Sequence, residues 1–475
     1  MSFSIQNALA FTPEWWLLLG AAVAFTLGRV RTGSEDQTSV VGLIAVVLAL
    51  AGLLTQLRSS ITIFEGAFVV DGYTRLLQGI VLASAAACLL LALADRTWTP
   101  APDFAGFLLL ATTAAMLIAG AADLVSLALG VALLGMGLGV MAVEARPSST
   151  PAAGVGAFIA STLAAAVIAY GFALLYGLSG ETALAAVGRR LGQTGSRPAL
   201  AVALALVLAG FGVLIGMVPV QWGMQSIFQR APLPVSAFTG SVAVTAALGG
   251  LMRVVTGVAA SGSAVSLLLA ILAAATMTGA TVAALGERSL RRLLSWILVG
   301  QAGFGLAALV GARQGGVAAL LVFSASLAAG LLAAVAALVA YFHRVHSDRV
   351  ADISGMASYA PAPAAVLALA LASLSGIPPL AGFFGRLLVL QAVVDAGYSW
   401  LALIGVASTV LAAFSALRLV RTVFLDPPVF EVHPARPHRA QGTALGLGTL
   451  AVVAFGAFLG PLLGFATVAA RAVLP

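Results

Sequence analysis

Arg386 is the residue whose position most clearly suggests chemistry, because it stands within the long apolar stretch SLSGIPPLAGFFGRLLVL. A charged side chain at the centre of a bilayer costs roughly 2.5–3.5 kcal/mol on insertion scales, so it should face a partner or a water-filled cavity. Arg386 then either shapes a path for protons electrostatically or is a structural charge satisfied by carbonyl groups that a helix break sets free. Asp395 is the acid on this stretch, but nine residues span about 13 Å of helix, too far for a direct pair.

Arg253 and His343 are further candidates for holding or moving a proton, and each also has a simpler interpretation. Arg253 ends an apolar run in GGLMRVV, where an arginine extends its head to the lipid phosphates and anchors the helix. His343 and His346 open the polar segment HRVHSDR. Because histidine titrates near neutral pH, they predict either a proton-entry relay or a solvated loop face. Asp71, in FVVDGYTR, is expected in an ordered loop outside the membrane.

The sequence offers no set of residues for metal or nucleotide chemistry. Cys88 is the single cysteine, which excludes a disulfide within the chain and a cysteine-held metal cluster. His433 and His438 lie in EVHPARPHR without a third ligand in view, so no metal site is expected. The sequence also lacks a phosphate-binding loop and a dinucleotide fingerprint.

Composition places the chain in a membrane. Hydrophobic residues make up 61 % of the 475 residues and charged residues 8 %, whereas soluble domains carry roughly 25 % charged residues. The net charge of +7 comes from arginines that stand in short loops, a pattern of membrane topology and not of a nucleic-acid interface. All 23 basic residues are arginine, and the N-terminal segment has neither the basic region nor the cleavage site of a signal peptide.

Apolar runs of the roughly 20 residues needed to cross a bilayer follow one another along the chain. About fourteen spans are expected, at residues 13–28, 39–57, 76–94, 104–121, 124–143, 152–178, 198–220, 236–257, 263–285, 293–312, 316–342, 361–391, 399–422 and 443–468. Loops after odd-numbered spans hold roughly fourteen arginines, and loops after even-numbered spans together with the C-terminus hold roughly eight. By the positive-inside rule the odd-numbered loops are cytoplasmic and both termini face outward.

The seventh and twelfth spans are expected to be interrupted. The seventh runs into Pro219 and Gly223, and the twelfth contains Pro378 and Pro379. Proline removes a backbone donor and clashes with the preceding turn. Interruptions five spans apart indicate two inverted repeats of five helices, as in secondary transporters, with two unrelated proline kinks as the alternative. The predicted segments are 1–103 (helices one to three), 104–257 (first repeat), 258–425 (second repeat) and 426–475 (last loop and helix).

Four motifs resemble a known family: SLSGIPPLAGFFGR, APLPVSAF, LGERSLRRLLSW and FVVDGYTRL. They are similar to the antiporter-like membrane subunits of respiratory complex I, and within that family to the subunit N branch. The wider family includes Mrp-type antiporter subunits and membrane-hydrogenase subunits. The resemblance covers nearly the whole chain and implies an all-α membrane protein of fourteen helices, with two inverted five-helix repeats and discontinuous helices seven and twelve. It also implies proton half-channels and a polar axis of one glutamate and several lysines.

Three positions of that axis have lost their titratable groups here. By the resemblance, the glutamate position of the fifth helix holds Ala132, and the lysine positions of the seventh and eighth helices hold Leu214 and Val244. Alanine, leucine and valine carry no proton. The sequence therefore predicts that the usual proton axis is lost.

Three positions keep a polar residue of a different kind. Gln221 and Gln301 stand where the family has histidines, and Arg386 stands at the lysine position of the twelfth helix. Arginine stays charged at any pH that the protein meets, so Arg386 can fix a charge without passing a proton by titration. With Arg253 and His343, these residues are the candidates for a replacement path in which water and hydroxyl groups carry the proton.

The resemblance implies a membrane-arm subunit of a proton-translocating NADH–quinone oxidoreductase in a bacterial inner membrane. Its expected partners are lipid and the other membrane-arm subunits, including further antiporter-like subunits. No cofactor is expected in this chain; FMN, iron–sulfur clusters and quinone would belong to partner subunits. The alternatives are a subunit of an Mrp-type cation/proton antiporter and a structural subunit of a membrane hydrogenase.

Overall fold

The computed structural model describes residues 10–30, 35–56, 61–95, 97–98, 100–143, 152–193, 198–258, 263–429 and 439–473, and they are almost entirely helical. Eleven of the described helices are long and apolar enough to cross a membrane. Three expected spans remain. They coincide with the helix Thr12–Val30, which carries Glu14 and Arg29, with the 17-residue helix Phe104–Gly120, and with the two half-helices Pro361–Leu374 and Ala381–Asp395. The expectation of an all-α membrane protein with about fourteen spans is confirmed.

The N-terminal part contains three spans and one small hairpin. The spans are α2 (Thr12–Val30), α3 (Glu35–Thr55) and α4 (Gly72–Ala94). Between α3 and α4, strands β1 (Ile61–Ile63) and β2 (Phe68–Val70) pair antiparallel around the short helix η1 (Phe64–Gly66). This hairpin lies in the loop expected before the third span. It is the one β-sheet in the described part of the chain.

The two predicted repeats follow in order. The first contains α5 (Phe104–Gly120), α6 (Leu124–Val143), α7 (Ala152–Ser179), α8 (Leu184–Gln193), α9 (Pro198–Ile215), α10 (Trp222–Arg230), α11 (Leu233–Phe238), the π-helical turn η2 (Thr239–Ala243) and α12 (Val244–Gly257). The second contains α13 (Ser263–Leu285), α14 (Leu290–Val310), η3 (Ala312–Gln314), α15 (Gly316–Phe342), η4 (Val350–Ile353), α16 (Met356–Tyr359), α17 (Pro361–Leu374), α18 (Ala381–Asp395) and α19 (Ser399–Phe424). The limits of the four predicted segments stay predictions.

Both expected interruptions are present, and they have the same backbone geometry. Gly216 and Gly376 follow the first half-helices with φ of 78° and 77°, a left-handed conformation that glycine adopts readily. The next residue in each break bonds five residues back: Met217 N–H donates to Gly212 O at 2.8 Å, and Ile377 N–H donates to Ala372 O at 2.9 Å. The Val218–Pro219 and Pro378–Pro379 peptides are both cis. Two unrelated proline kinks would not share this pattern.

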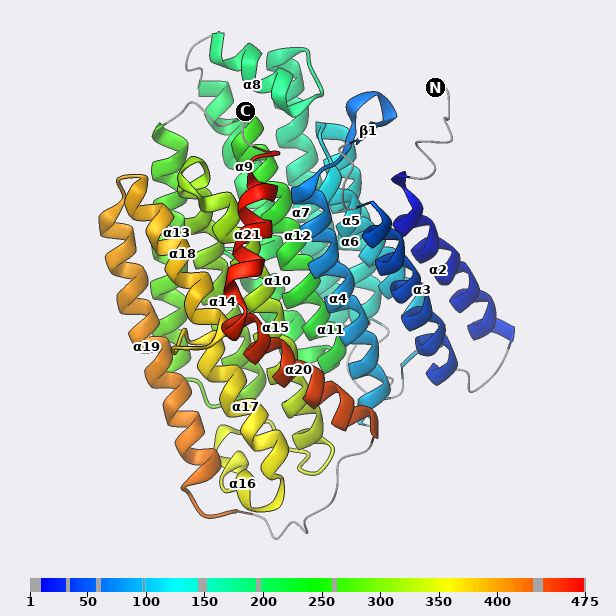
Figure 1. Cartoon of the computed structure of the whole chain (residues 1–475), viewed down its shortest axis with the longest axis vertical. Helices are drawn as coiled ribbons and strands as arrows, with labels where there is room; N and C mark the ends of the chain where they lie inside the picture. The colour runs from blue at the N-terminus through cyan, green and yellow to red at the C-terminus, as the bar shows by residue number, and fades with distance from the viewer. Residues whose placement is uncertain are drawn as a thin grey trace.

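A second pair of contacts repeats in the same way. At the start of α6, Leu124 N–H donates to Thr182 O, and Leu184 N–H donates to Ala122 O. At the start of α14, Leu290 N–H donates to Asp348 O, and Val350 N–H donates to Arg288 O. In both cases the second helix of a repeat is tied to the loop that follows the third. The two loops lie at opposite ends of the molecule, beside α8 and beside α16 (Figure 1), as inversion of the repeats requires.

The core lies where the two repeats meet. Helix α15 is buried along nearly its whole length, as is the segment from α11 to α12. Helix α15 packs against α17 and α18 of its own repeat, and against α4 and α20 (Arg439–Ala457) from outside the repeats. The two broken helices therefore face a protein interior, which is what unpaired backbone at membrane depth needs.

The last span is a correction to the expectation of one continuous helix. It is broken at Phe458, between α20 and α21 (Leu459–Ala470). Helix α20 crosses the molecule obliquely (Figure 1). It begins beside the end of α4, where Gln441 Nε2 donates to Ala94 O at 3.2 Å. A Cβ added at Gly456 would lie 2.7 Å from Pro379 O, so α20 ends directly against the second break.

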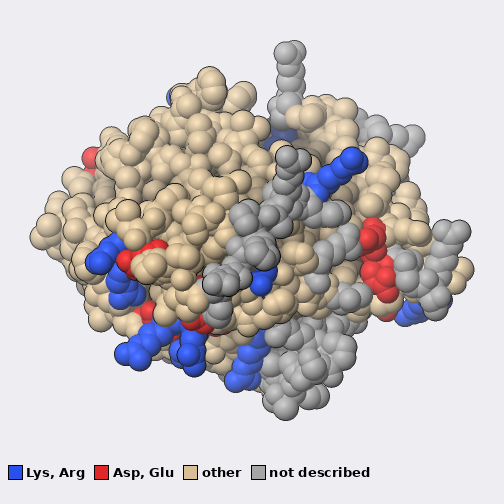
Figure 2. Space-filling model, turned by 90° about the horizontal axis from the view of Figure 1, so that it is seen from below, with Lys and Arg blue, Asp and Glu red and all other residues tan. Residues whose placement is uncertain are grey.

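Arginines gather at one end of the molecule. Figure 2 looks at the lower end of Figure 1 and shows arginine side chains across that face. The described arginines in the loops and helix ends there are Arg29, Arg230, Arg288, Arg291, Arg292, Arg344, Arg349, Arg418, Arg421 and Arg439. Helix α2 begins, and α21 ends, toward the opposite end (Figure 1).

Candidate functional site

Arg386 lies on α18, one turn beyond the second break, and its side chain is 5 % exposed. The break leaves the last carbonyl groups of α17 without their helical partners. Arg386 supplies donors to two of them: Nη1 donates to Ser375 O at 3.0 Å, and Nη2 donates to Leu374 O. Nη1 also donates to Thr409 Oγ1 on α19 at 3.1 Å. The structural role predicted for Arg386, a charge satisfied by freed carbonyls, is thus realised in the contacts.

Gln301 on α14 joins Arg386 at the same break. Its Nε2 donates to Leu374 O, the acceptor that Arg386 also uses. The ring of Phe304, also on α14, lies under the guanidinium, with 4.5 Å between Arg386 Cζ and the ring centroid. The break is therefore held by one charged and one neutral donor from two different helices.

A small cavity of about 20 Å³ begins at Arg386, which is enough room for a water molecule. Its polar lining comes from Thr281 on α13 and from Ser408 and Ser415 on α19. Helix α13 ends, and α19 ends, at the arginine-rich end of the molecule, so the cavity extends from Arg386 toward that end.

Among the residues that the structure describes, the first break has no such charged centre. Matching the two breaks residue by residue from Gly216 and Gly376 places Ser226 of α10 opposite Arg386. Gln221, at the start of α10, is half-buried, and its Oε1 has no partner among the described residues; nor has Nε2 of Gln225 one turn later. Of the two breaks, the second therefore holds the buried charge.

The three positions predicted to have lost the proton axis lie in apolar packing. Val244 is fully buried at the start of α12, and Leu214 is 6 % exposed at the end of α9. Ala132 is half-buried on α6. Thr245 follows Val244 in α12, and its buried Oγ1 has no partner among the described residues. The buried Oγ of Ser324, on α15, also has no partner among the described residues.

Arg253 is a correction to the expectation of a lipid-facing anchor. It is 7 % exposed, and its Nη2 lies 3.5 Å from Asp71 Oδ1. Nη2 also donates to Thr74 Oγ1, and Nε donates to Ala119 O, both at 2.7 Å. Asp71 ends the loop before α4, is itself buried, and caps α4 by accepting from Thr74 N–H at 2.7 Å. Arg253 and Asp71 thus join α12, α4 and α5.

Glu14 is a buried acid that the sequence reasoning did not single out. It stands in the first turn of α2 and is 1 % exposed. Gln78 Nε2 on α4 donates to Glu14 Oε1 at 2.8 Å, while Oε2 meets no partner among the described residues. The signal available was an acid inside an apolar run, in TPEWWLLL.

His343 does not reach the other candidates. It caps the end of α15 and is exposed, and His346 in the following loop is exposed too. Nearby, burial raises the pKa of the Tyr359 phenol, against the opposing effect of the Arg344 guanidinium. His433 and His438 lie outside the described residues. The described residues hold no cluster of three His, Cys, Asp or Glu side chains that could bind a metal ion.

Of the five candidates for a proton path, the structure brings together Gln301 and Arg386 only. Gln221 lies at the other break, Arg253 in the ion pair with Asp71, and His343 on the surface. The Gln301–Arg386 centre has a fixed charge, hydrogen-bond donors and a hydroxyl-lined cavity. Such a centre can orient water and stabilise negative charge.

Comparison with known proteins places this arrangement in a family. The family described as NADH:quinone oxidoreductase/Mrp antiporter, TM, matches residues 121–412. NADH-quinone oxidoreductase subunit N of Methylobacterium nodulans is 30 % identical over 471 residues, with 97 % of each chain covered. A chain of respiratory complex I from Thermus thermophilus is 26 % identical with a TM-score of 0.80, covering 96 % of this chain and 99 % of that chain.

The Mrp complex from Dietzia sp. contains a chain of the same fold, with a TM-score of 0.84 and 21 % identity, covering 98 % of this chain and 97 % of that chain. At that identity the likeness concerns the fold alone. The Methylobacterium nodulans relative, and that of Heliobacterium modesticaldum at 30 % identity with 100 % of each chain covered, are both subunit N of NADH-quinone oxidoreductase. The chain belongs to the subunit N family of NADH–quinone oxidoreductase, within the antiporter-like membrane proteins.

Proposed function

We propose that this chain is a membrane-arm subunit of a proton-translocating NADH–quinone oxidoreductase. The full-length similarity to subunit N sequences and to a chain of complex I supports this role. FMN, iron–sulfur clusters and quinone would be bound by partner subunits, which carry out the electron transfer. This chain would sit beside other antiporter-like subunits and respond to that chemistry through movement of charge in the membrane.

The proton path of this subunit runs through the second repeat. The observation that carries this proposal is the cavity of about 20 Å³ that connects Arg386 with Thr281, Ser408 and Ser415. Water in that cavity would pass a proton by exchanging hydrogen bonds with the hydroxyl groups. Arg386 keeps its charge and sets the electrostatic barrier, while Gln301 holds the carbonyl of Leu374 in place.

Ser324, Thr245, Gln221 and Gln225 would extend the path beyond Arg386. Each has a buried polar atom without a partner among the described residues, and such atoms in a protein interior are usually bonded to ordered water. The alternative is a subunit that transmits conformational change without conducting. The loss of titratable groups at Ala132, Leu214 and Val244 favours that alternative.

An Mrp-type antiporter subunit is the second candidate function, because the family description that matches residues 121–412 includes Mrp antiporters. A cation/proton antiporter needs a site that exchanges a proton for a cation. Around Arg386 the described residues provide hydroxyl groups and carbonyl oxygens without a carboxylate. A fixed positive charge there repels a cation.

We also propose that both termini face the outside of a bacterial inner membrane. The arginine-rich end carries the described loops after odd-numbered spans, and positive loops remain in the cytoplasm. The ends of α2 and α21 that are nearest the termini lie at the opposite end.

The test is the composition and proton stoichiometry of the complex that co-purifies with this chain. Flavin and iron–sulfur subunits with NADH oxidation are expected; membrane antiporter-like partners alone would overturn the redox assignment. In proteoliposomes, Ser408→Leu should block the cavity and lower the number of protons moved per NADH, while Ser408→Ala, which removes the hydroxyl group but leaves room for water, should lower it less. An unchanged proton yield in Ser408→Leu would remove the proposed path and leave the subunit a non-conducting coupling element.

A further inference from the structure

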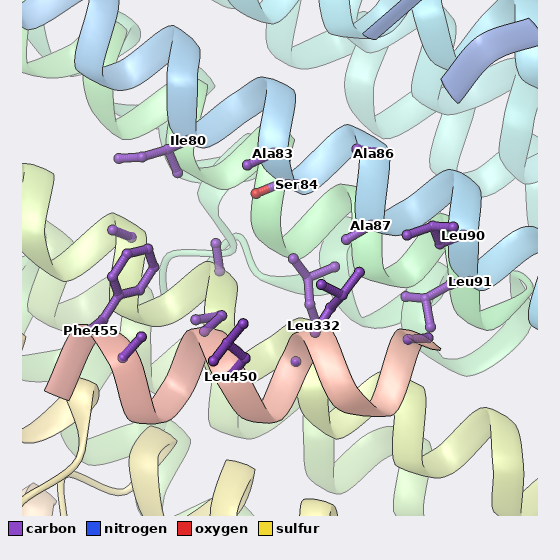
Figure 3. Close-up of a pocket in the computed structure, with 18 residues that line it drawn as sticks. Ile80, Ala83, Ser84, Ala86, Ala87, Leu90, Leu91, Leu332, Leu450 and Phe455 are labelled. Atoms are coloured by element: carbon purple, nitrogen blue, oxygen red, sulfur yellow. The ribbon is translucent and has the colours of Figure 1, made fainter. Parts of the chain in front are cut away.

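A second and much larger cavity lies outside the proton path, between α4, α15 and α20. It encloses about 410 Å³ and is lined by 18 residues, of which Ser84 alone has a polar side chain. Figure 3 shows Ile80, Ala87 and Leu91 of α4 facing Leu450 and Phe455 of α20, with Leu332 of α15 between them. Pockets of 300–1,000 Å³ are the size that binds small ligands.

The oblique course of α20 creates this cavity. At its middle, α20 touches α15 so closely that a Cβ added at Gly448 would lie 2.9 Å from Ala333 Cα. Near its start, Gln441 holds α20 to the end of α4. Beyond Gln441, α20 and α4 diverge, and alanine side chains of both helices leave the space between them unfilled. Leu447 and Leu450 of α20 are exposed along this side, so the cavity opens to the membrane.

The apolar lining and the length of this cavity indicate which kind of molecule it binds. An apolar cavity is not filled by water, and at this depth the surrounding solvent is lipid. The cavity runs along α4 from Ile80 to Leu91, which is about 16 Å of helix. That length matches one leaflet, half of a hydrocarbon core of about 30 Å.

The end of the cavity offers a positive charge. Leu91 and Ala444 line its lower end, and Arg439 stands exposed in the first turn of α20, about 7 Å further along the helix axis. The nearest acid on α4, Asp95, is buried and accepts hydrogen bonds from Thr97 at 2.6 and 3.0 Å. Basic groups at the edge of an intramembrane pocket bind anionic lipid headgroups.

We infer that the cavity between α4, α15 and α20 is a binding site for one acyl chain of an anionic phospholipid, whose phosphate is held by Arg439. The lipid comes from the leaflet at the arginine-rich end. Its acyl chain fills the space beneath α20 and fixes that helix against α4 and α15. This site is independent of the redox assignment of the complex.

The test uses the intact complex in nanodiscs that contain phosphatidylglycerol with a photoactivatable diazirine on its acyl chain. Mass spectrometry of the cross-linked peptides should place label on cavity-lining residues of all three helices. Ala451→Phe fills the cavity and should abolish that label. Val453→Phe is the matched control, because Val453 lies on the same helix, is 46 % exposed and does not line the cavity.

The headgroup is tested with Arg439→Gln and with a phosphatidylcholine probe of the same chain length. Labelling should be stronger with phosphatidylglycerol than with phosphatidylcholine, and Arg439→Gln should remove the difference. Label that is spread evenly over exposed helix faces, or that survives Ala451→Phe, would overturn the site. Absence of label from all three helices would show that a partner subunit or a quinone tail occupies the cavity instead, and would equally overturn the inference.

Discussion

Gln301 and Arg386 donate hydrogen bonds to a single acceptor, the carbonyl oxygen of Leu374. That carbonyl is available because the helix ends there, and Gly376 turns the chain away with φ of 77°. Two donors from α14 and α18 thus take the place of the helical N–H that the break removes. The most polar point inside the second repeat exists because proline and glycine interrupt a helix.

Arg386→Met should destabilise the subunit, because the Ser375 carbonyl then loses its buried donor, while the Leu374 carbonyl keeps only the donor of Gln301. Each unsatisfied buried group costs about 1–3 kcal/mol. Arg386→Lys keeps the charge and part of the bonding and should cost less. Thermal inactivation of the purified complex measures both variants. A methionine variant as stable as the parent would show that Arg386 is not structural.

Arg253→Met should destabilise the chain more strongly than an exposed arginine would, since it leaves Asp71 buried without its partner. Removing one member of a buried ion pair costs about 3–5 kcal/mol. The double variant Arg253→Met with Asp71→Asn should recover much of the loss. Abundance of the chain in the membrane and the unfolding midpoint provide the readout. Additive losses in the double variant would contradict the pairing.

Gly376→Ala should weaken the second break, because alanine at positive φ costs about 1–2 kcal/mol, and the new Cβ would lie 3.0 Å from Arg386 Cδ. Gly216→Ala should have a similar effect at the first break. Gly446→Ala in α20 is the control, because a Cβ there meets nothing within 4 Å. The control should be neutral or stabilising in a thermal shift assay. Equal effects at all three positions would refute the argument.

The orientation can be tested with thiol labelling, because Cys88 is the single cysteine and is buried. In a Cys88→Ser background, Gln314→Cys and Arg349→Cys place one thiol at each end of the molecule, at exposed positions. A membrane-impermeant maleimide should label Gln314→Cys in intact cells and Arg349→Cys in inverted vesicles. The reverse pattern would place the termini inside.

The sequence predicts well those features that depend on neighbouring residues. Pro219, Pro378 and Pro379 mark the two breaks because a proline acts on its own helix. The span count follows from apolar runs. The structural role of Arg386 was also accessible, because the carbonyls that satisfy it lie within twelve residues on the same broken segment.

Features that depend on distant contacts were not accessible. Arg253 and Asp71 pair across 182 positions of the numbering (253 − 71), and each residue alone resembles an exposed end of a helix. Glu14 meets Gln78 on another helix. These two pairs are results of packing. The break at Phe458 differs, because Pro461 lacks the N–H that a continuous helix would donate to Ala457 O, so the sequence did contain a local signal for it. Only its position against the second break depends on packing.

Helix α20 follows both repeats along the chain, yet it covers the break at Pro379 and spans the distance between α4 and α15. During synthesis the second break therefore enters the bilayer before the helix that covers it. A chain that stops short of residue 439 would contain both repeats and still leave that break without its cover.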